Sequence, residues 1–275
     1  MIKSARIISL VACGISLAFS QIQPIVNDDL GEGSVDWGSR TILATGIGAP
    51  NPELPTATQR PSATRAAQMI ALRNAIETVR GITLNSSTTV ENLMVTNDRI
   101  NTSVEGFVRG FQQKGRTRYM SDGTVEITME IPLDQISMEV LGNELNDSPS
   151  TSVFQGQKAS TPTIFTGLVI DARELDIRPA LSPKVLDENG LEVYGSAYVS
   201  REWASTHGIV GYSRELSEAA RMDRVGDTPG MVKAIRASGP NRADIVISNN
   251  DAADIRSASE NLKFLSECRV IIVID

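Results

Sequence analysis

The sequence predicts an α+β protein with two domains, each an antiparallel or mixed sheet packed against one or two helices. Three observations support this prediction. A long helical pattern with alanine at every fourth position stands between segments that have strand character. A polar, Ser/Thr-rich stretch at residues 142–162 separates these elements from a second series of strands and helices. The chain has 275 residues, of which 41% are hydrophobic, so it is long enough to form two cores.

The expected organisation follows the changes in composition along the chain. The segments are a signal peptide at 1–20, a mobile arm at 21–40, a first α+β domain at 41–141, a linker at 142–162 and a second α+β domain at 163–275.

The first residues have the pattern of an export signal. Lys3 and Arg6 precede an uncharged apolar run at residues 7–19, which is too short to span a bilayer. The pattern predicts that the mature protein works in the periplasm or at the outer membrane.

Two interpretations of the leader differ in where the mature chain begins. Ala18 and Ser20 are small residues that a signal peptidase accommodates, so we expect cleavage between Ser20 and Gln21. The alternative is a lipoprotein signal, in which Cys13 becomes the lipidated first residue. That alternative leaves a short apolar core and gives the mature chain an apolar start instead of a polar tether.

Composition limits the classes of partner. Loss of two basic residues with the leader changes the formal net charge from −7 to −9, so we expect no binding to nucleic acid. Cleavage also removes Cys13 and leaves Cys268 as the one remaining cysteine, which excludes an intramolecular disulfide. Cys268 lies in an apolar run and is expected to be a small buried hydrophobe.

The first domain begins with a strand at residues 41–48, which the following prolines end. An amphipathic helix at 62–80 follows, and Gly81 is placed to end it. Its alanine stripe predicts close packing against a sheet. Residues 103–111 alternate and are expected to form a strand whose two glycines face that stripe. Asp122-Gly123 then predicts a hairpin, so that the sheet is an antiparallel meander.

The second domain has a similar mixture of elements. We expect strands at 163–172, around 231–236, at 244–248 and at 268–275, a hairpin turning at Asn189-Gly190, and helices at 213–222 and 251–265. Ser248 or Asn249 is placed to cap the last helix. The C-terminal strand is apolar on both faces, which predicts a central place in its sheet.

Residues 41–133 resemble the domain of the twenty-kilodalton outer-membrane lipoprotein family, which is also found in the flagellar proteins FlgP and FlgT. The matching motifs are ATGIG before the helix, ATRAAQMIALRNAIETVRGI within it, and VEGFVRGF leading to YMSDGTVEITMEIPL. The resemblance implies an α+β domain on the periplasmic side of the outer membrane, often in a ring around the flagellar motor, and no enzyme activity. It implies no catalytic residues.

A hydrolytic site has weak support in the sequence. His207 is the only histidine, and Ser205 and Ser213 are its near neighbours along the chain. Residues 211–215, GYSRE, have the first glycine and the serine of a nucleophile elbow, but Glu215 replaces the second glycine. We therefore expect no catalytic residue. If the protein were an enzyme, His207, Ser213 and Glu215 would be the first residues to mutate.

Metal and cofactor sites are not expected either. The acidic clusters at residues 27–29, 187–190 and 249–254 lack the alternating ligands and the distant glutamate of a calcium loop. One histidine and one mature cysteine do not make a zinc site. Gly46 and Gly48 are followed by prolines instead of a helix start, so they do not predict a phosphate loop.

The sequence favours a binding function over a catalytic one. The first hypothesis is an exported structural or assembly protein of the cell envelope that uses sheet edges and the linker, with a flagellar role as its most specific form. Its expected partners are copies of itself, as a homo-oligomer, or other envelope proteins, with association to the outer membrane. The second hypothesis is a periplasmic ligand-binding or adaptor protein with a cleft between the domains.

Overall fold

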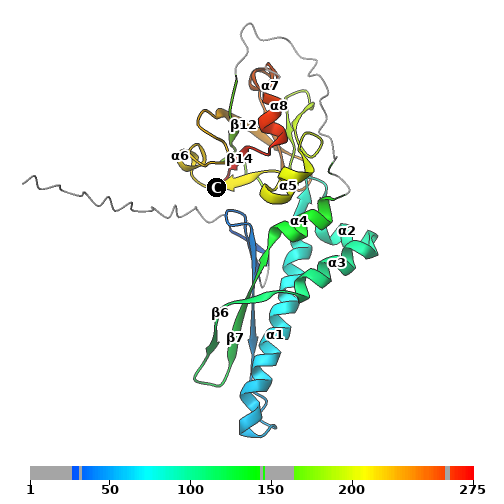
Figure 1. The fold of residues 1–275 in the computed structure, drawn as a ribbon, viewed down its shortest axis with the longest axis vertical. Coiled ribbons are helices and arrows are strands. Elements are labelled where there is room, and N and C mark those ends of the chain that lie inside the picture. Colours follow the sequence, from blue (N-terminus) through cyan, green and yellow to red (C-terminus); the bar gives the residue numbers. More distant parts are fainter. Residues whose placement is uncertain (1–26, 31–32, 143–144, 146–163, 258–260) are drawn as a thin grey trace, which may run out of the picture.

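The computed structural model describes residues 27–30, 33–142, 145, 164–257 and 261–275, and it confirms the two-domain α+β fold (Figure 1). The leader, with Cys13, Ser20 and Gln21, lies outside the described residues, as does most of the expected linker. Within the described ranges, no helix combines the length and the apolar character needed to cross a bilayer.

The first domain is built on an antiparallel sheet with the strand order β1-β2-β3-β7-β6. Its strands are β1 (Asn27–Leu30), β2 (Gly33–Asp36), β3 (Thr41–Gly48), β6 (Gln112–Tyr119) and β7 (Val125–Pro132). The predicted strand at 41–48 and the predicted hairpin at Asp122-Gly123 are both confirmed. The expectation of a mobile arm is wrong for residues 27–30 and 33–36, which pair as β1 and β2. The reason is that Val35 is fully buried in the core and Trp37 nearly so.

Helix α1, Thr56–Gly81, covers one face of this sheet (Figure 1). The predicted stripe is buried and consists of Ala63, Ala67, Ala71 and Ala75. The glycines that face it are Gly46 and Gly48 in β3. A Cβ placed on Gly46 would lie 2.1 Å from the Ala67 carbonyl oxygen, so the helix axis approaches the strand as closely as the backbones allow. The helix begins at Thr56, six residues before the expected start, and it includes Pro61.

The strand expected at residues 103–111 is wrong, because residues 98–109 form a helix. The short helices of this domain are α2 (Val90–Thr96), α3 (Asp98–Arg109) and α4 (Leu133–Leu141). The Asn97 side chain caps α3 by accepting the N–H groups of Arg99 and Ile100. Ile100, Val104 and Val108 are buried, and their spacing of four is helical. Gly106, expected to face the alanine stripe, lies with open space beside it.

The second domain contains a seven-stranded mixed sheet with the order β10-β9-β13-β12-β8-β14-β11. Its strands are β8 (Leu168–Asp171), β9 (Val185–Leu186), β10 (Glu192–Tyr194), β11 (Gly211–Ser213), β12 (Gly230–Ser238), β13 (Asp244–Ile247) and β14 (Val270–Val273). The C-terminal strand β14 is parallel to both of its neighbours, β8 and β11, and all four of its residues are buried. Its predicted place inside the sheet is therefore confirmed.

The helices of the second domain depart further from expectation. They are α5 (Arg201–His207), α6 (Leu216–Ala219), α7 (Asn249–Arg256) and α8 (Asn261–Ser266). The helix expected at 213–222 is reduced to α6, because Ser213 belongs to β11. The helix expected at 251–265 is seen as α7 and α8, with residues 258–260 outside the description. Ser248 caps α7 as predicted, by accepting the N–H of Asp251. Helix α5 was not expected.

A hairpin of the first domain joins the two domains. It consists of β4 (Thr83–Asn85) and β5 (Thr88–Thr89). The N–H groups of Leu181 and Ser182 donate to the carbonyl oxygens of Thr83 and Leu84, at 3.0 and 2.8 Å. Leu84 and Leu181 belong to one apolar cluster that runs through both domains. The domains are thus packed as a single unit and share part of their core.

Candidate functional site: an inter-domain pocket

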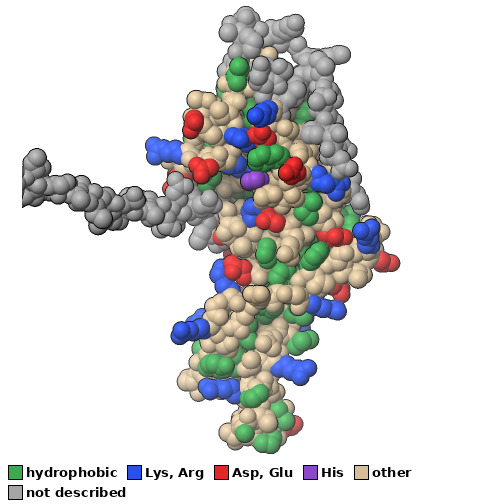
Figure 2. All heavy atoms as spheres, in the orientation of Figure 1, with side chains coloured by type: hydrophobic (Ala, Val, Ile, Leu, Met, Phe, Trp, Pro, Cys, Tyr) green, Lys and Arg blue, Asp and Glu red, His purple; other side chains and the backbone are tan. Residues whose placement is uncertain are grey.

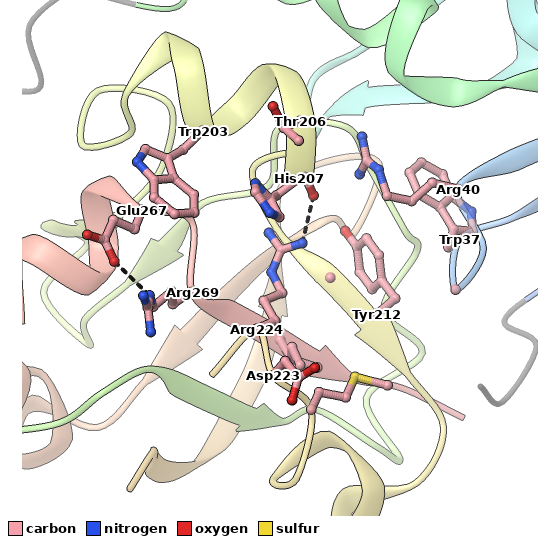
Figure 3. A pocket seen from close by; sticks show the side chains of 14 residues that line it. Trp37, Arg40, Trp203, Thr206, His207, Tyr212, Asp223, Arg224, Glu267 and Arg269 are labelled. Carbon is pink, nitrogen blue, oxygen red and sulfur yellow. Dashed lines mark hydrogen bonds and ion pairs between the residues drawn. The ribbon is translucent and has the colours of Figure 1, made fainter. Parts of the chain in front are cut away.

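A pocket of about 380 Å³ lies where the β2–β3 turn meets the second domain (Figure 3). Its aromatic and basic lining residues are Trp37 and Arg40 from the first domain and Trp203, His207, Tyr212, Arg224 and Arg269 from the second. The chain has two tryptophans, and both line this pocket. Figure 2 shows the histidine on this face of the molecule, among hydrophobic, acidic and basic side chains.

The first-domain wall is a tight turn that follows β2. The Asp36 carboxylate accepts the main-chain N–H of Gly38 at 2.9 Å, which holds the turn in place. Arg40 has a φ of +55°, a left-handed conformation that a residue with a side chain rarely adopts. Its Nε donates to Oδ1 of Asp134 in α4 at 2.7 Å. The turn therefore presents Trp37 and Arg40 to the second domain in a fixed geometry.

The second-domain wall is mainly aromatic. Trp203 and His207 are one turn apart on α5, and their rings stack with centroids 5.0 Å apart. Tyr212 on β11 meets the Trp37 ring at 5.4 Å in an edge-to-face contact. Burial raises the pKa of Tyr212, whose hydroxyl donates to the Ala180 carbonyl oxygen at 3.0 Å. The tyrosine is therefore a fixed, neutral part of the wall.

Arg224 lies at the centre of the site (Figure 3). Its Nε donates to the Cys268 carbonyl oxygen at 2.8 Å, and its Nη1 and Nη2 donate to those of His207 and Gly208 at 2.6 and 2.8 Å. His207 and Gly208 lie at the C-terminal end of α5, where carbonyl groups lack helical partners and carry partial negative charge. Burial lowers the pKa of Arg224 to about 10, so the side chain remains cationic at neutral pH. No carboxylate of the described residues lies within ion-pair distance of it.

Three other charged residues line the pocket, Asp223, Glu267 and Arg269. Arg269 pairs with Glu267 at 2.7 Å. Asp223 also lines the pocket and is exposed. These groups make their part of the pocket mixed in charge, whereas the part around Arg40 and Arg224 is basic.

The structure does not bring the candidate hydrolytic residues together. Ser213 is fully buried, and its Oγ accepts the Glu215 N–H at 3.2 Å within a local turn. His207 instead stacks on Trp203, and its buried Nδ1 has no hydrogen-bond partner among the described residues. Ser205 donates to the Glu202 carbonyl oxygen in its own helix. His207 contributes to the pocket as a wall residue.

The acidic clusters have local structural roles. The Asp187 carboxylate accepts the N–H groups of Asn189 and Leu191 in the predicted turn and pairs with Arg256 at 2.7 Å. The cluster at 249–254 begins α7, and the cluster at 27–29 lies in β1. The part of the chain that the structure describes holds no group of three or more potential metal ligands.

Cys268 is buried, as expected. Burial raises the pKa of its thiol to about 11, so the thiol stays protonated at neutral pH.

Sequence reasoning missed most of the residues that make the pocket. Trp37 and Arg40 were assigned to the mobile arm, and Arg224 and Arg269 carried no motif. One usable signal was present. Trp37 and Trp203 are the two tryptophans of a chain with 4% aromatic residues, and large aromatic side chains are enriched at binding sites.

The fold and the site together define a two-domain α+β protein whose candidate site is assembled from both domains. The family model described as Treponema pallidum Tp0624, second domain, matches residues 167–275. This match covers the second domain and less than half of the chain. No curated protein matches the chain.

The comparison corrects the resemblance drawn from residues 41–133. No model of the outer-membrane lipoprotein family matches, and the family model that does match lies entirely in the second domain. The physical reason for the error is visible in the fold. The motifs that suggested the family are a packing pattern of alanine and glycine, and part of the pattern, VEGFVRGF, lies mostly in a helix instead of a strand.

Proposed function

We propose that this protein is an exported, non-catalytic binding protein of the cell envelope whose ligand occupies the inter-domain pocket. The observation that carries the proposal is the pocket itself, which joins aromatic walls from both domains to two arginines held in fixed positions. Concave sites between domains, apolar with a few convergent polar groups, are typical of small-ligand sites. The leader pattern at residues 1–20 supports export.

The packing of the domains supports binding without large motion. The shared core and the backbone hydrogen bonds from Leu181 and Ser182 fix one domain on the other. A preformed pocket loses little conformational entropy when a ligand enters, which favours affinity. The hydroxyl of Ser213, the serine of the GYSRE motif, is buried and engaged with Glu215.

Native mass spectrometry of the protein purified from its host envelope tests this proposal. We expect a bound small molecule in the wild type, lost in Trp203→Ala, which removes one wall of the pocket. Tyr119→Ala is the matched control, because Tyr119 is an exposed aromatic residue on β6, outside the pocket. Equal native and denatured masses for the wild type would contradict the proposal.

A second candidate function is structural assembly into a homo-oligomer or with other envelope proteins. The observation in its favour is the outer edge of β6, which pairs with β7 alone in the described sheet. Against it, β6 has a bulge with Gly115 at a φ of +70° and carries basic side chains, and both features discourage edge-to-edge pairing. Light scattering of the mature chain distinguishes the two, since assembly requires a mass above that of the monomer.

A further inference from the structure

The two arginines of the pocket converge on one residue, Gly208. The Nη2 of Arg224 donates to the Gly208 carbonyl oxygen at 2.8 Å. Arg40 approaches the same residue from the first domain, because a Cβ built on Gly208 would lie 1.9 Å from the Arg40 Nη1. The charge of Arg40 also lowers the pKa of Arg224, although burial has the larger effect. Two like charges are therefore held side by side.

The local positive charge is incompletely neutralised. Oδ1 of Asp134 accepts a hydrogen bond from the Nε of Arg40 at 2.7 Å and lies 2.5 Å from Nη2, within ion-pair distance. Arg224 has main-chain carbonyl groups as its partners, which satisfy three of its five N–H groups. Among the described residues, the Asp134 carboxylate is thus the one within ion-pair distance of either guanidinium group. A desolvated cation without a counter-ion is unfavourable, and an anion entering the pocket would remove that cost.

The N–H groups that remain suit an oxyanion. The buried Nη2 of Arg40 has no hydrogen-bond partner among the described residues, and Arg224 keeps one hydrogen on each Nη. Guanidinium groups in fixed positions bind carboxylate and phosphate oxygens through charge-assisted hydrogen bonds. Both arginines line the same cavity as Trp203 and Tyr212, so an attached apolar ring would have an aromatic surface to pack against.

We propose that the pocket binds a small organic anion, with its carboxylate or phosphate group between Arg40 and Arg224 and its apolar part against the aromatic wall. This inference rests on the proposed function and names the chemical class of the ligand. The backbone supports the arrangement, because Gly208 has a φ of +68° and lacks the Cβ that would displace Arg40. Any other residue at 208 would separate the two arginines.

The test uses the intrinsic fluorescence of the mature chain, residues 21–275, because both tryptophans line the pocket. Three probes of similar shape are titrated at constant ionic strength: benzoate, phenyl phosphate and the neutral benzamide. We expect saturable quenching by at least one of the two anions, with benzamide weaker by about tenfold or more, since it lacks the charge. Comparing the two anions shows whether the site prefers carboxylate or phosphate.

Variants then locate the anion. Arg224→Gln is expected to weaken anion binding by about tenfold or more. Arg40→Gln should also weaken anion binding. This second variant tests the inference independently if the loss of the Arg224 hydrogen bonds prevents Arg224→Gln from folding. Arg65→Gln is the control, because Arg65 is an exposed arginine on α1 outside the pocket. Circular dichroism checks that each variant is folded.

Three results would overturn the inference. The first result is that benzamide binds as tightly as the anions. The proposed binding function would then stand, but the preference for an anionic ligand would be refuted. The second result is that the folded Arg40→Gln variant binds the anions with the same affinity as the wild type. The third result is that neither anion binds. Native mass spectrometry then decides separately whether the pocket carries another ligand.

Discussion

Gly46→Ala tests the close packing of β3 against α1. The added methyl group would lie 2.1 Å from the Ala67 carbonyl oxygen and 2.3 Å from the Ala71 nitrogen. Both are backbone atoms of a helix, so no side-chain rotation relieves the clash. Real Cβ atoms essentially never approach other heavy atoms closer than 3.0 Å, so the helix would have to move away by about 1 Å.

The size of the effect follows from what that movement disrupts. Overpacking of a well-packed core costs about 1–3 kcal/mol, and a clash with helix backbone, which no side-chain rotation relieves, belongs at the upper end of that range. With a urea m-value of about 3 kcal/mol/M, the midpoint of unfolding should fall by about 1 M. Urea titration followed by circular dichroism measures the midpoint.

The matched control for this substitution is Gly106→Ala in α3. Gly106 is helical and has no heavy atom within 4 Å of a built Cβ. Alanine is favoured over glycine inside a helix by about 0.5–1 kcal/mol, so the midpoint should rise slightly. The reasoning is refuted if Gly46→Ala unfolds at the wild-type urea concentration, or if the two substitutions have equal effects.

Three further predictions concern the second domain and the leader. Burial raises the pKa of Asp187, but hydrogen bonds from Arg256 and from the turn outweigh burial and leave it below the ordinary 3.8. The ionised carboxylate therefore stabilises the fold above about pH 4, and this contribution is lost as pH falls through the lowered pKa. Asp187→Asn removes the ionisable group, so the free energy of unfolding of this variant should depend less on pH in the acid range. Ser248→Ala removes the cap of α7 and should lower the free energy of unfolding by about 1 kcal/mol, as measured by urea titration. Intact mass of the protein from its native host should correspond to a chain that starts at unmodified Gln21, whereas a triacylated Cys13 would show that the lipoprotein interpretation is correct.

The sequence was most informative where one local rule determined the structure. The strand at 41–48, the hairpin turns at Asp122-Gly123 and Asn189-Gly190, and the Ser248 cap are all encoded by a few adjacent residues. The buried strand β14 was recognisable because apolar residues occupy both of its faces. These predictions needed no knowledge of distant contacts.

The errors arose where short-range patterns were ambiguous or tertiary contacts decided the outcome. Residues 103–111 alternate like a strand, yet the buried residues Val104 and Val108 share a helical face. Residues 27–36 are polar and rich in glycine, and residues 27–30 and 33–36 become strands because β3 offers an edge and the core accepts Val35. The pocket could not be predicted, because its walls come from segments more than 160 residues apart in the chain and meet only through domain packing.

The hairpin formed by β4 and β5 has a consequence for any attempt to divide the molecule. Leu84 is almost completely covered in the intact chain, beside residues of the other half. A recombinant fragment limited to 167–275 would leave its docking surface uncovered and the main-chain amides of Leu181 and Ser182 without acceptors. Such a fragment should aggregate or recruit a foreign strand, whereas co-expression with a piece that contains residues 27–142 should keep it in solution.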